Sequence, residues 1–291
     1  MRFLWRWLKR AILTPLVLIL LLLAPVVRTE LACRGTPLPQ DHQPLLPPED
    51  HRAEERTYTT YPEWHIVHAY DDYANVIATG DPHEFGFVRA VRGFWSSLCP
   101  LVQMADEHGG FTTESKMTIY TIGVSFTAEL MMKAAYEETL GRAATWIRGD
   151  ARAPLDDLSA RQAADYVVFL QQTPWYKWDF RRDAAALAAA DSGAFRDGER
   201  DIALGLEFGA KATYAGVIAG AVASTGQDEL TIRSVVTGLT DAQLLAIPDV
   251  RIVGNMPQGT VIETPRYRAF TRILEKIAVA GGQMVEIAGN D

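Results

Sequence analysis

The stretch that sets the architecture of the chain is AILTPLVLILLLLAPVV, residues 11–27. It contains no charged residue, and at about 1.5 Å rise per residue a helix of this length extends roughly 26 Å, slightly less than a bilayer core. Leucine and tryptophan residues within 4–8 lengthen the apolar segment, with the indoles at the membrane interface. We therefore expect residues 1–34 to hold a cytoplasmic segment and a transmembrane helix that contacts the bilayer through residues 11–27.

The charges around this helix predict its orientation. Arg2, Arg6, Lys9 and Arg10 precede the apolar run, whereas the few basic residues just after it are offset by Glu30. The positive-inside rule then places the amino terminus in the cytoplasm and the rest of the chain outside. We expect a single-pass protein of the inner membrane with a periplasmic body.

A cleaved signal peptide and a lipoprotein are the alternatives to an anchor. Cleavage needs small residues at two positions after the apolar run, but Ala24 is followed by Pro25, and Ala32 has Glu30 two residues before it. The triplet Leu31-Ala32-Cys33 suggests lipidation, yet Glu30 stands where an aliphatic side chain is needed. We favour the uncleaved anchor.

The two cysteines of the chain, Cys33 and Cys99, both follow the apolar run. In an oxidising compartment an even number of cysteines is compatible with a disulfide between them. The alternative is that Cys99 is a small buried apolar residue and Cys33 a free thiol. The sequence leaves both open.

The composition is that of a globular protein, with 48% hydrophobic and 22% charged residues. The net charge is −8, and the body is more acidic still because basic residues are concentrated in residues 1–34. An acidic body repels phosphate backbones, so we expect no nucleic-acid binding. The sequence also lacks a Gly-rich phosphate loop, a G-x-S-x-G elbow and a CxxC pair.

Beyond the anchor the chain is expected to be mainly α with a C-terminal α+β module. Five prolines among polar residues mark 35–56 as a semi-rigid linker. Residues 57–226 show helical signals and predict a helical bundle, in which Pro100 should kink or end the second helix. Residues 227–291 follow the order β-α-β-β-α-β of the ferredoxin-like fold.

The boundaries of the expected elements follow from caps, turns and periodicity. The bundle helices are expected near 60–80, 81–100, 113–140, 158–172, 173–193 and 198–224. In the module, strands are expected at 230–236, 250–256, 260–264 and 284–288, with helices at 241–247 and 267–280.

The segment 202–223 is long enough to cross a membrane and carries a seam of small residues. Glu207 and Lys211 lie inside it, each costing roughly 2.5–3.5 kcal/mol near the centre of an inserted helix. They are four residues apart and can pair. We favour a helix buried in a soluble bundle.

The candidate metal site is a helix face that carries His65, His68 and Asp72 at i, i+3 and i+7. Two imidazoles and a carboxylate suit zinc or non-haem iron, so a divalent metal is the cofactor that this pattern indicates. The sequence has neither HExxH nor the Glu-x-x-His of di-iron bundles. The alternative, which we favour, is an exposed helix face.

A polar stripe on the third helix includes Glu129, Lys133 and Glu137, whose charges alternate in sign. Such a stripe is typical of a solvated face. The alternative is a polar cleft, shared with Glu63 and Arg92, that would supply acid–base groups.

An aromatic cluster, Trp175, Tyr176 and Trp178, stands beside basic residues at the start of the fifth helix. Core packing is the simpler interpretation. The alternative is a contact with the outer face of the bilayer or with a partner protein.

These patterns favour a non-enzymatic role, namely binding or scaffolding in a membrane complex with other envelope proteins. One alternative is a metal-dependent enzyme or metal-binding protein that uses His65, His68 and Asp72. Another is a helical pocket for a lipid or quinone. The sequence indicates no substrate.

Overall fold

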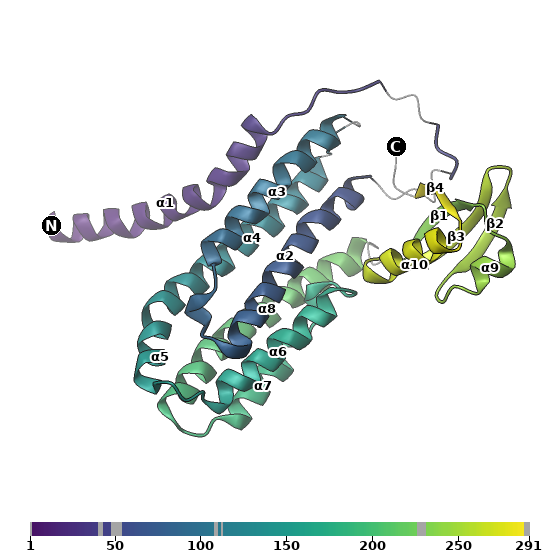
Figure 1. Cartoon of the computed structure of the whole chain (residues 1–291). Helices are drawn as coiled ribbons and strands as arrows, with labels where there is room; N and C mark the ends of the chain where they lie inside the picture. Colours follow the sequence, from purple (N-terminus) through teal and green to yellow (C-terminus); the bar gives the residue numbers. More distant parts are fainter. Residues whose placement is uncertain are drawn as a thin grey trace. The chain divides into compact units, whose positions relative to one another are not determined.

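The structure is a computed structural model that describes residues 2–39, 43–47, 54–107, 110–111, 113–225 and 231–287. The chain is mostly helical and ends in a small four-stranded antiparallel sheet (Figure 1). It divides into two compact units that alternate along the sequence. The first comprises 1–41, 55–66 and 86–136, and the second comprises 42–54, 67–85 and 137–291.

The first unit is helical. It contains α1 (Arg2–Ala32), the start of α2 (Glu54–Thr79), α3 (Phe87–Glu107) and α4 (Thr113–Tyr136). α1 contacts both α3 and α4. Pro100 was expected to kink its helix or to end it. The helix does not end there, because α3 continues to Glu107. The turns beyond the proline bury Leu101, Val102 and Ala105, and this burial offsets the missing backbone hydrogen bond.

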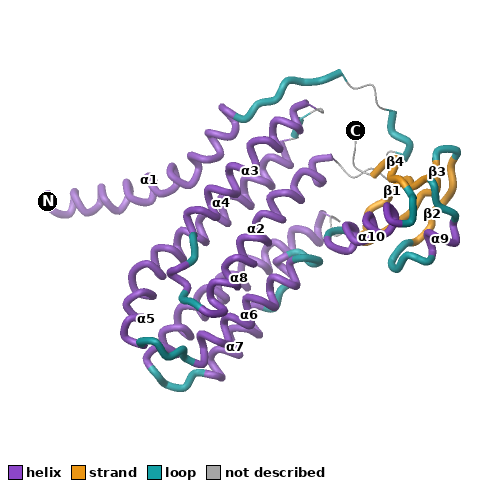
Figure 2. Tube along the Cα trace, in the orientation of Figure 1, coloured by secondary structure: helices purple, strands orange, loops and turns teal. Residues whose placement is uncertain are grey.

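Besides residues 42–54, the second unit contains the remainder of α2 and continues through helices and short helical turns (Figure 2). The elements are η2 (Pro82–Glu84), the π-helical turn η3 (Glu137–Gly141), α5 (Arg142–Arg148), α6 (Pro154–Leu170), η4 (Trp175–Lys177), α7 (Phe180–Ala190) and α8 (Phe195–Thr225).

Helix boundaries in this unit differ from expectation where capping was misread. α6 begins at Pro154, not near 158, because proline is well suited to the first helical position. α7 begins only at Phe180, since Asp179 accepts a hydrogen bond from the Arg182 amide at 3.0 Å and thereby caps it. The π turn replaces the expected helical continuation to residue 140.

The C-terminal module is a sheet with two helices. Its elements are β1 (Thr231–Thr237), α9 (Asp241–Leu245), β2 (Arg251–Met256), β3 (Gly259–Pro265), α10 (Arg268–Val279) and β4 (Gln283–Ile287). The strand order is β2-β3-β1-β4 and every neighbouring pair is antiparallel. Observed and expected boundaries agree within two residues.

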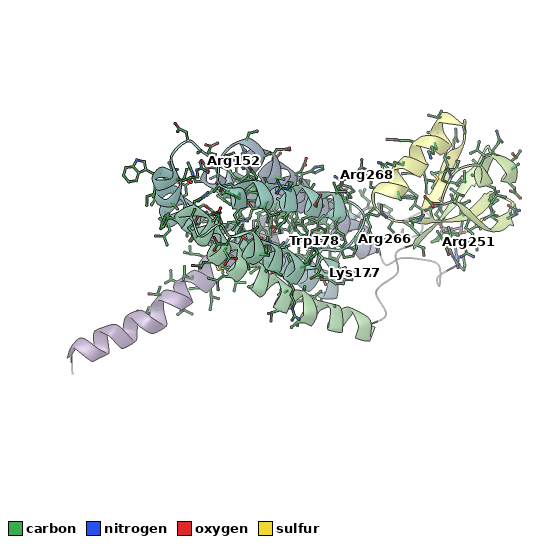
Figure 3. All side chains as sticks on the ribbon, turned by 90° about the horizontal axis from the view of Figure 1, so that it is seen from below. Arg152, Lys177, Trp178, Arg251, Arg266 and Arg268 are labelled. Carbon is green, nitrogen blue, oxygen red and sulfur yellow. A yellow bond between two sulfur atoms is a disulfide. The ribbon has the colours of Figure 1, made fainter. Side chains whose placement is uncertain are left out.

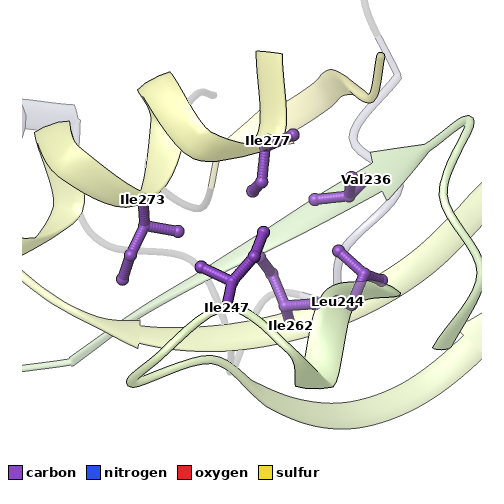
Figure 4. Packing of buried hydrophobic residues seen from close by; sticks show 6 residues of the cluster. All are labelled: Val236, Leu244, Ile247, Ile262, Ile273 and Ile277. Carbon is purple, nitrogen blue, oxygen red and sulfur yellow. The ribbon is translucent and has the colours of Figure 1, made fainter. Parts of the chain in front are cut away.

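The core of this module lies between the sheet and its two helices (Figure 4). Its buried members are Val236, Leu244, Ile247, Ile262, Ile273 and Ile277. A second cluster contains Ile232, Val235 and Val261 together with Leu46 from the expected linker. Leu46 is buried there, so part of the linker packs on the module.

Helix α8 is buried along only one side. Phe195–Gly220 is a helical segment long and apolar enough to cross a membrane, and 11% of its apolar window is buried. Leu204 and Ala215 are buried, whereas Ile202, Leu206 and Val217 are exposed. The prediction of a helix buried in a bundle therefore holds for one face only.

Candidate functional site

The most concentrated group of buried charges lies in the second unit, where η3, α5, α6 and α8 approach one another. We call it the ionic cluster. It consists of Arg148, Arg196 and Arg200 with Asp81, Glu137, Asp156 and Glu199. Burying this many charges is costly unless each is paired, and the contacts show how the pairing is achieved.

Arg200 on α8 is 1% exposed, and its guanidinium reaches two carboxylates. Nη1 and Nη2 donate to the two oxygens of Glu137 at 2.9 and 3.2 Å, and Nη2 also donates to Glu199 Oε1 at 2.6 Å. Burial lowers the pKa of Arg200, but Glu199 and Glu137 outweigh it and hold that pKa well above its usual value. The side chain therefore stays charged.

Glu137 is positioned by the π turn. Such turns insert one extra residue into a helix and redirect the side chains that follow. The turn ends at Gly141, where a Cβ would overlap Glu137 Oε2. A side chain at position 141 would therefore push the Glu137 carboxylate away from its contact with Arg200.

Asp156 is the centre of the other half of the cluster. Its carboxylate accepts hydrogen bonds from Arg148 Nη1 at 2.7 Å, Arg196 Nε at 3.0 Å and the Ala153 amide at 3.1 Å. Burial raises the pKa of Asp156, but the charge of Arg196 and the hydrogen bond from Arg148 lower it more. The net result is a pKa below the usual range, so Asp156 is ionised.

Arg148 and Arg152 tie this half to the segment around residue 80. Arg148 makes a bidentate contact with Asp81 at 2.9 and 3.0 Å. Arg152, labelled in Figure 3, donates to the carbonyls of Gly80 and Ile77 at 2.9 and 2.8 Å. These carbonyls belong to the end of α2, which lacks further helical amides to bond them.

Asp197 joins the starts of two helices beside the cluster. Its carboxylate accepts from the Leu155 amide at 3.0 Å and from the Ser192 hydroxyl. The first turn of α6 and the segment before α8 are thereby joined by one fully buried side chain.

The ionic cluster is suited to fixing helix ends, because its arginines pair with carboxylates on neighbouring elements. Arginine stays protonated throughout the accessible pH range, and Asp156 is held ionised.

Comparisons of the chain with protein-family models, curated proteins and solved structures found no match.

The three residues of the expected metal site have different surroundings. His65 Nε2 lies 3.1 Å from the Ala90 carbonyl, and its ring makes edge contacts with Phe94 and Phe126. The side chains of His68 and Asp72 are exposed. Within the ranges that the structure describes, no group of three or more His, Cys, Asp and Glu side chains could hold a metal ion.

The expected polar stripe is wrong at Glu137. A solvated face was expected, but Glu137 is 2% exposed and bound to Arg200. Glu129 and Lys133 are half-buried and belong to the first unit, as do Glu63 and Arg92. The five residues proposed for a polar cleft are thus divided between the two units.

The aromatic residues around η4 are packed against helices. Trp175 stacks on Tyr214 of α8 with ring centroids 5.4 Å apart. Trp178, labelled in Figure 3, donates from Nε1 to Asp183 at 2.7 Å. Tyr176 and both indoles pack against the cluster of Tyr166, Phe180 and Ala215 and remain half-buried.

Glu207 and Lys211 pair as expected for residues four apart on α8, with Nζ to Oε1 at 3.1 Å. The Lys211 ammonium also lies 5.1 to 5.7 Å from the ring centroids of Tyr70, Tyr166 and Phe180. Aromatic faces stabilise a cation that has lost part of its water. Both charges are thereby accommodated on the packed side of the helix.

Cys33 and Cys99 form a disulfide in the first unit, with their Cα atoms 5.1 Å apart. It joins the residue after α1 to α3. Of the two alternatives that the sequence left open, the structure contains the bonded one.

Proposed function

We propose that this chain is a single-pass inner-membrane protein with a cytoplasmic amino terminus and a periplasmic body that binds or scaffolds other envelope proteins. The observation that carries the proposal is the change of surroundings along α1. Nine large apolar side chains between residues 13 and 27 are exposed: Leu13, Leu16, Val17, Leu18, Ile19, Leu20, Leu21, Leu23 and Val27. A lipid environment would cover them.

The surroundings change directly after these residues. Thr29 is buried, and Glu30 accepts hydrogen bonds from the Tyr120 hydroxyl at 2.6 Å and from Lys116 Nζ at 3.2 Å. The Cys33–Cys99 disulfide follows. Helix α1 therefore passes from an exposed apolar segment to a polar end that is packed against α4. This change supports a membrane boundary near residues 27–29.

The disulfide also supports the sidedness of the proposal. Structural disulfides persist in oxidising compartments and are rare in the cytosol. Cys33 follows the apolar helix by only a few residues, so the body that begins there would lie on the oxidising side.

The scaffolding role is supported by how charge is used in the second unit. The ionic cluster joins the ends of several helices through buried, paired groups. These contacts hold the helices, and the outer surfaces that the helices form, in fixed positions. We further propose that the C-terminal module is ferredoxin-like, since its element order and its β2-β3-β1-β4 sheet agree with that plan. That fold by itself implies no activity.

The test is a fusion of alkaline phosphatase, which is active only outside the cytosol, after Asp291 of the full chain. Active phosphatase and a membrane-bound fusion are expected, and an inactive one would overturn the sidedness. A Leu18→Arg/Leu21→Arg variant should leave the membrane fraction, because each charge at the centre of a span costs about 2.5–3.5 kcal/mol. The matched control is Leu31→Arg/Leu38→Arg, which changes two exposed leucines beyond the span and should remain in the membrane.

A further inference from the structure

The exposed side of α8 is an apolar surface that the packing of the second unit does not use. Ile202, Leu206 and Val217 are 66, 72 and 64% exposed. At about 100° per residue these three side chains fall within roughly 60° of one another, so they form one continuous face. Gly209, Thr213 and Gly220 project from the same face and are exposed as well.

This face carries no charge over its whole length. Glu207 and Lys211 are the charged residues between Ile202 and Thr225, and they project from the other side of the helix. They neutralise each other at 3.1 Å, with side chains 18 and 12% exposed. From Ile202 to Gly220 the uncharged face extends about 27 Å at 1.5 Å per residue.

The opposite side of α8 is covered by protein. Leu204 packs with Leu155 of α6 and Leu187 of α7, and Ala215 packs with Tyr166 and Phe180. α6 and α7 also carry charged residues along their exposed sides. A helix covered in this way would have to take charged neighbours into hydrocarbon in order to cross a bilayer, which is costly. It can lie in the membrane surface at no such cost.

The edge of the face has the composition of a membrane interface. Tyr214 stands at this edge and stacks on Trp175 of η4, the turn that packs against α8. Tyr176 follows, and the ammonium of exposed Lys177 lies 6.0 Å from its ring centroid. Figure 3 labels Lys177 beside α8. Tryptophan and tyrosine favour the headgroup level, and a lysine there attracts anionic lipids.

From these observations we propose that the exposed apolar face of α8 lies flat in the lipid surface, with Trp175, Tyr176 and Lys177 at the headgroup level. The occupant is the outer leaflet of the membrane that α1 enters, so the proposal rests on the proposed anchor. An anchor that holds the chain at the bilayer raises the effective concentration of lipid near α8. Modest apolar burial is then sufficient for stable contact.

The test places a nitroxide on the full chain in nanodiscs of phosphatidylethanolamine and anionic phosphatidylglycerol. Val217→Cys and Leu206→Cys report on the face. Val168→Cys on α6 is the matched control, because it is the same residue type with the same 64% exposure. Collisions of each label with oxygen, which concentrates in lipid, are compared with collisions with a water-soluble nickel chelate.

We expect the labels at 206 and 217 to collide severalfold more with oxygen than with the nickel chelate, and to lie at the same depth in the bilayer. The label at 168 should show the reverse preference. Nickel access at 217 equal to that at 168, with the protein still in the disc, would overturn this proposal alone. Protein that fails to enter discs would instead overturn the anchor. Spin–spin broadening at 217 would identify a second copy of the chain as the occupant. Depths that differ by about 16 Å between the labels at 206 and 217 would show a helix that spans the membrane. Either result would overturn the flat lipid contact.

Discussion

Arg200 and Glu137 form a bidentate ion pair between α8 and the π turn, with N–O distances of 2.9 and 3.2 Å across 63 residues of sequence. The two side chains are 1 and 3% exposed. Water therefore cannot replace either partner. Removing one group leaves the other charge buried, which costs far more than the net value of the pair.

We predict that Glu137→Ala lowers the free energy of unfolding by about 3–5 kcal/mol, the typical cost of removing one partner of a buried ion pair. The matched control is Glu138→Ala, the adjacent glutamate, which pairs with Arg142 in an exposed i,i+4 contact. That change should cost less than about 1 kcal/mol. Chemical denaturation followed by far-ultraviolet circular dichroism measures both, and equal losses would contradict a special role for the buried pair.

Asp156 should make stability dependent on pH in the acid range. Its pKa is lowered in the folded chain, so its stabilising contribution is complete above the unfolded value of about 3.9 and disappears as pH falls through the folded value. The difference in stability between the wild type and Asp156→Asn should therefore be largest near neutral pH and shrink below about pH 4. Asp157→Asn, at the neighbouring and exposed position, should have little effect at neutral pH.

Local signals made the C-terminal module predictable. Thr240 and Gln243 form a capping box, with the Thr240 amide 2.9 Å from Gln243 Oε1, and Gly281 takes a positive φ of 86° after α10. Both signals act within a few residues, so the sequence pattern contains them. The amphipathic period of α10 likewise indicated its buried side, on which Ile273 and Ile277 lie.

The ionic cluster was not predictable in the same way. Asp81 and Arg148 are 67 residues apart, and Asp156 and Arg196 are 40 apart. Periodicity describes one helix at a time and does not indicate which distant helix supplies a partner. The dense charge run at 196–201 was the available signal, since Arg196 and Arg200 are four residues apart and lie on one face of α8.

The histidine face shows the same limit. Spacing placed His65, His68 and Asp72 together, but α2 passes from the first unit to the second between Ile66 and Val67. The neighbours of His65 come from α3 and α4, which the pattern of α2 does not contain.

The contact between His65 and Gly93 predicts a coupled pair of substitutions. A Cβ at position 93 would lie 2.7 Å from His65 Cε1, so Gly93→Ala should cost about 1–3 kcal/mol through overpacking. Adding His65→Ala should restore part of that loss in a double-mutant cycle. Gly205→Ala is the control, because nothing lies within 4 Å of its added Cβ, and it should be neutral or stabilising by up to about 1 kcal/mol.

The disulfide predicts a large effect in the first unit. Cys99→Ser should lower the free energy of unfolding by about 2–5 kcal/mol, since the bond closes a loop of 66 residues. Cys33→Ser should produce the same loss, and the double variant no more than either, because all three remove one bond. The gel mobility of the wild type should differ between non-reducing and reducing conditions. The mobility of the three variants should be the same under both conditions.

Glu286 holds a segment far away in sequence. Its two carboxylate oxygens accept from the amides of Leu45 and Leu46 at 2.7 and 2.9 Å, and the Leu46 side chain is buried against the sheet. Glutamine has one acceptor oxygen, so Glu286→Gln should cost about 1–3 kcal/mol by leaving one amide unsatisfied. Glu275→Gln, on the exposed side of α10, is the control and should be nearly neutral.

Leu46→Ala acts on the same docked segment through its side chain and should cost about 2–5 kcal/mol. Once either contact is lost, the segment at 43–47 is docked for a smaller fraction of the time. The second substitution therefore removes a contact that already contributes less to stability. The double variant should therefore lose less stability than the sum of the two single losses. Both single variants should also speed proteolysis of residues 43–47 in the full chain. Additive losses with unchanged proteolysis would show that the carboxylate and the leucine do not hold the segment together as one docked unit.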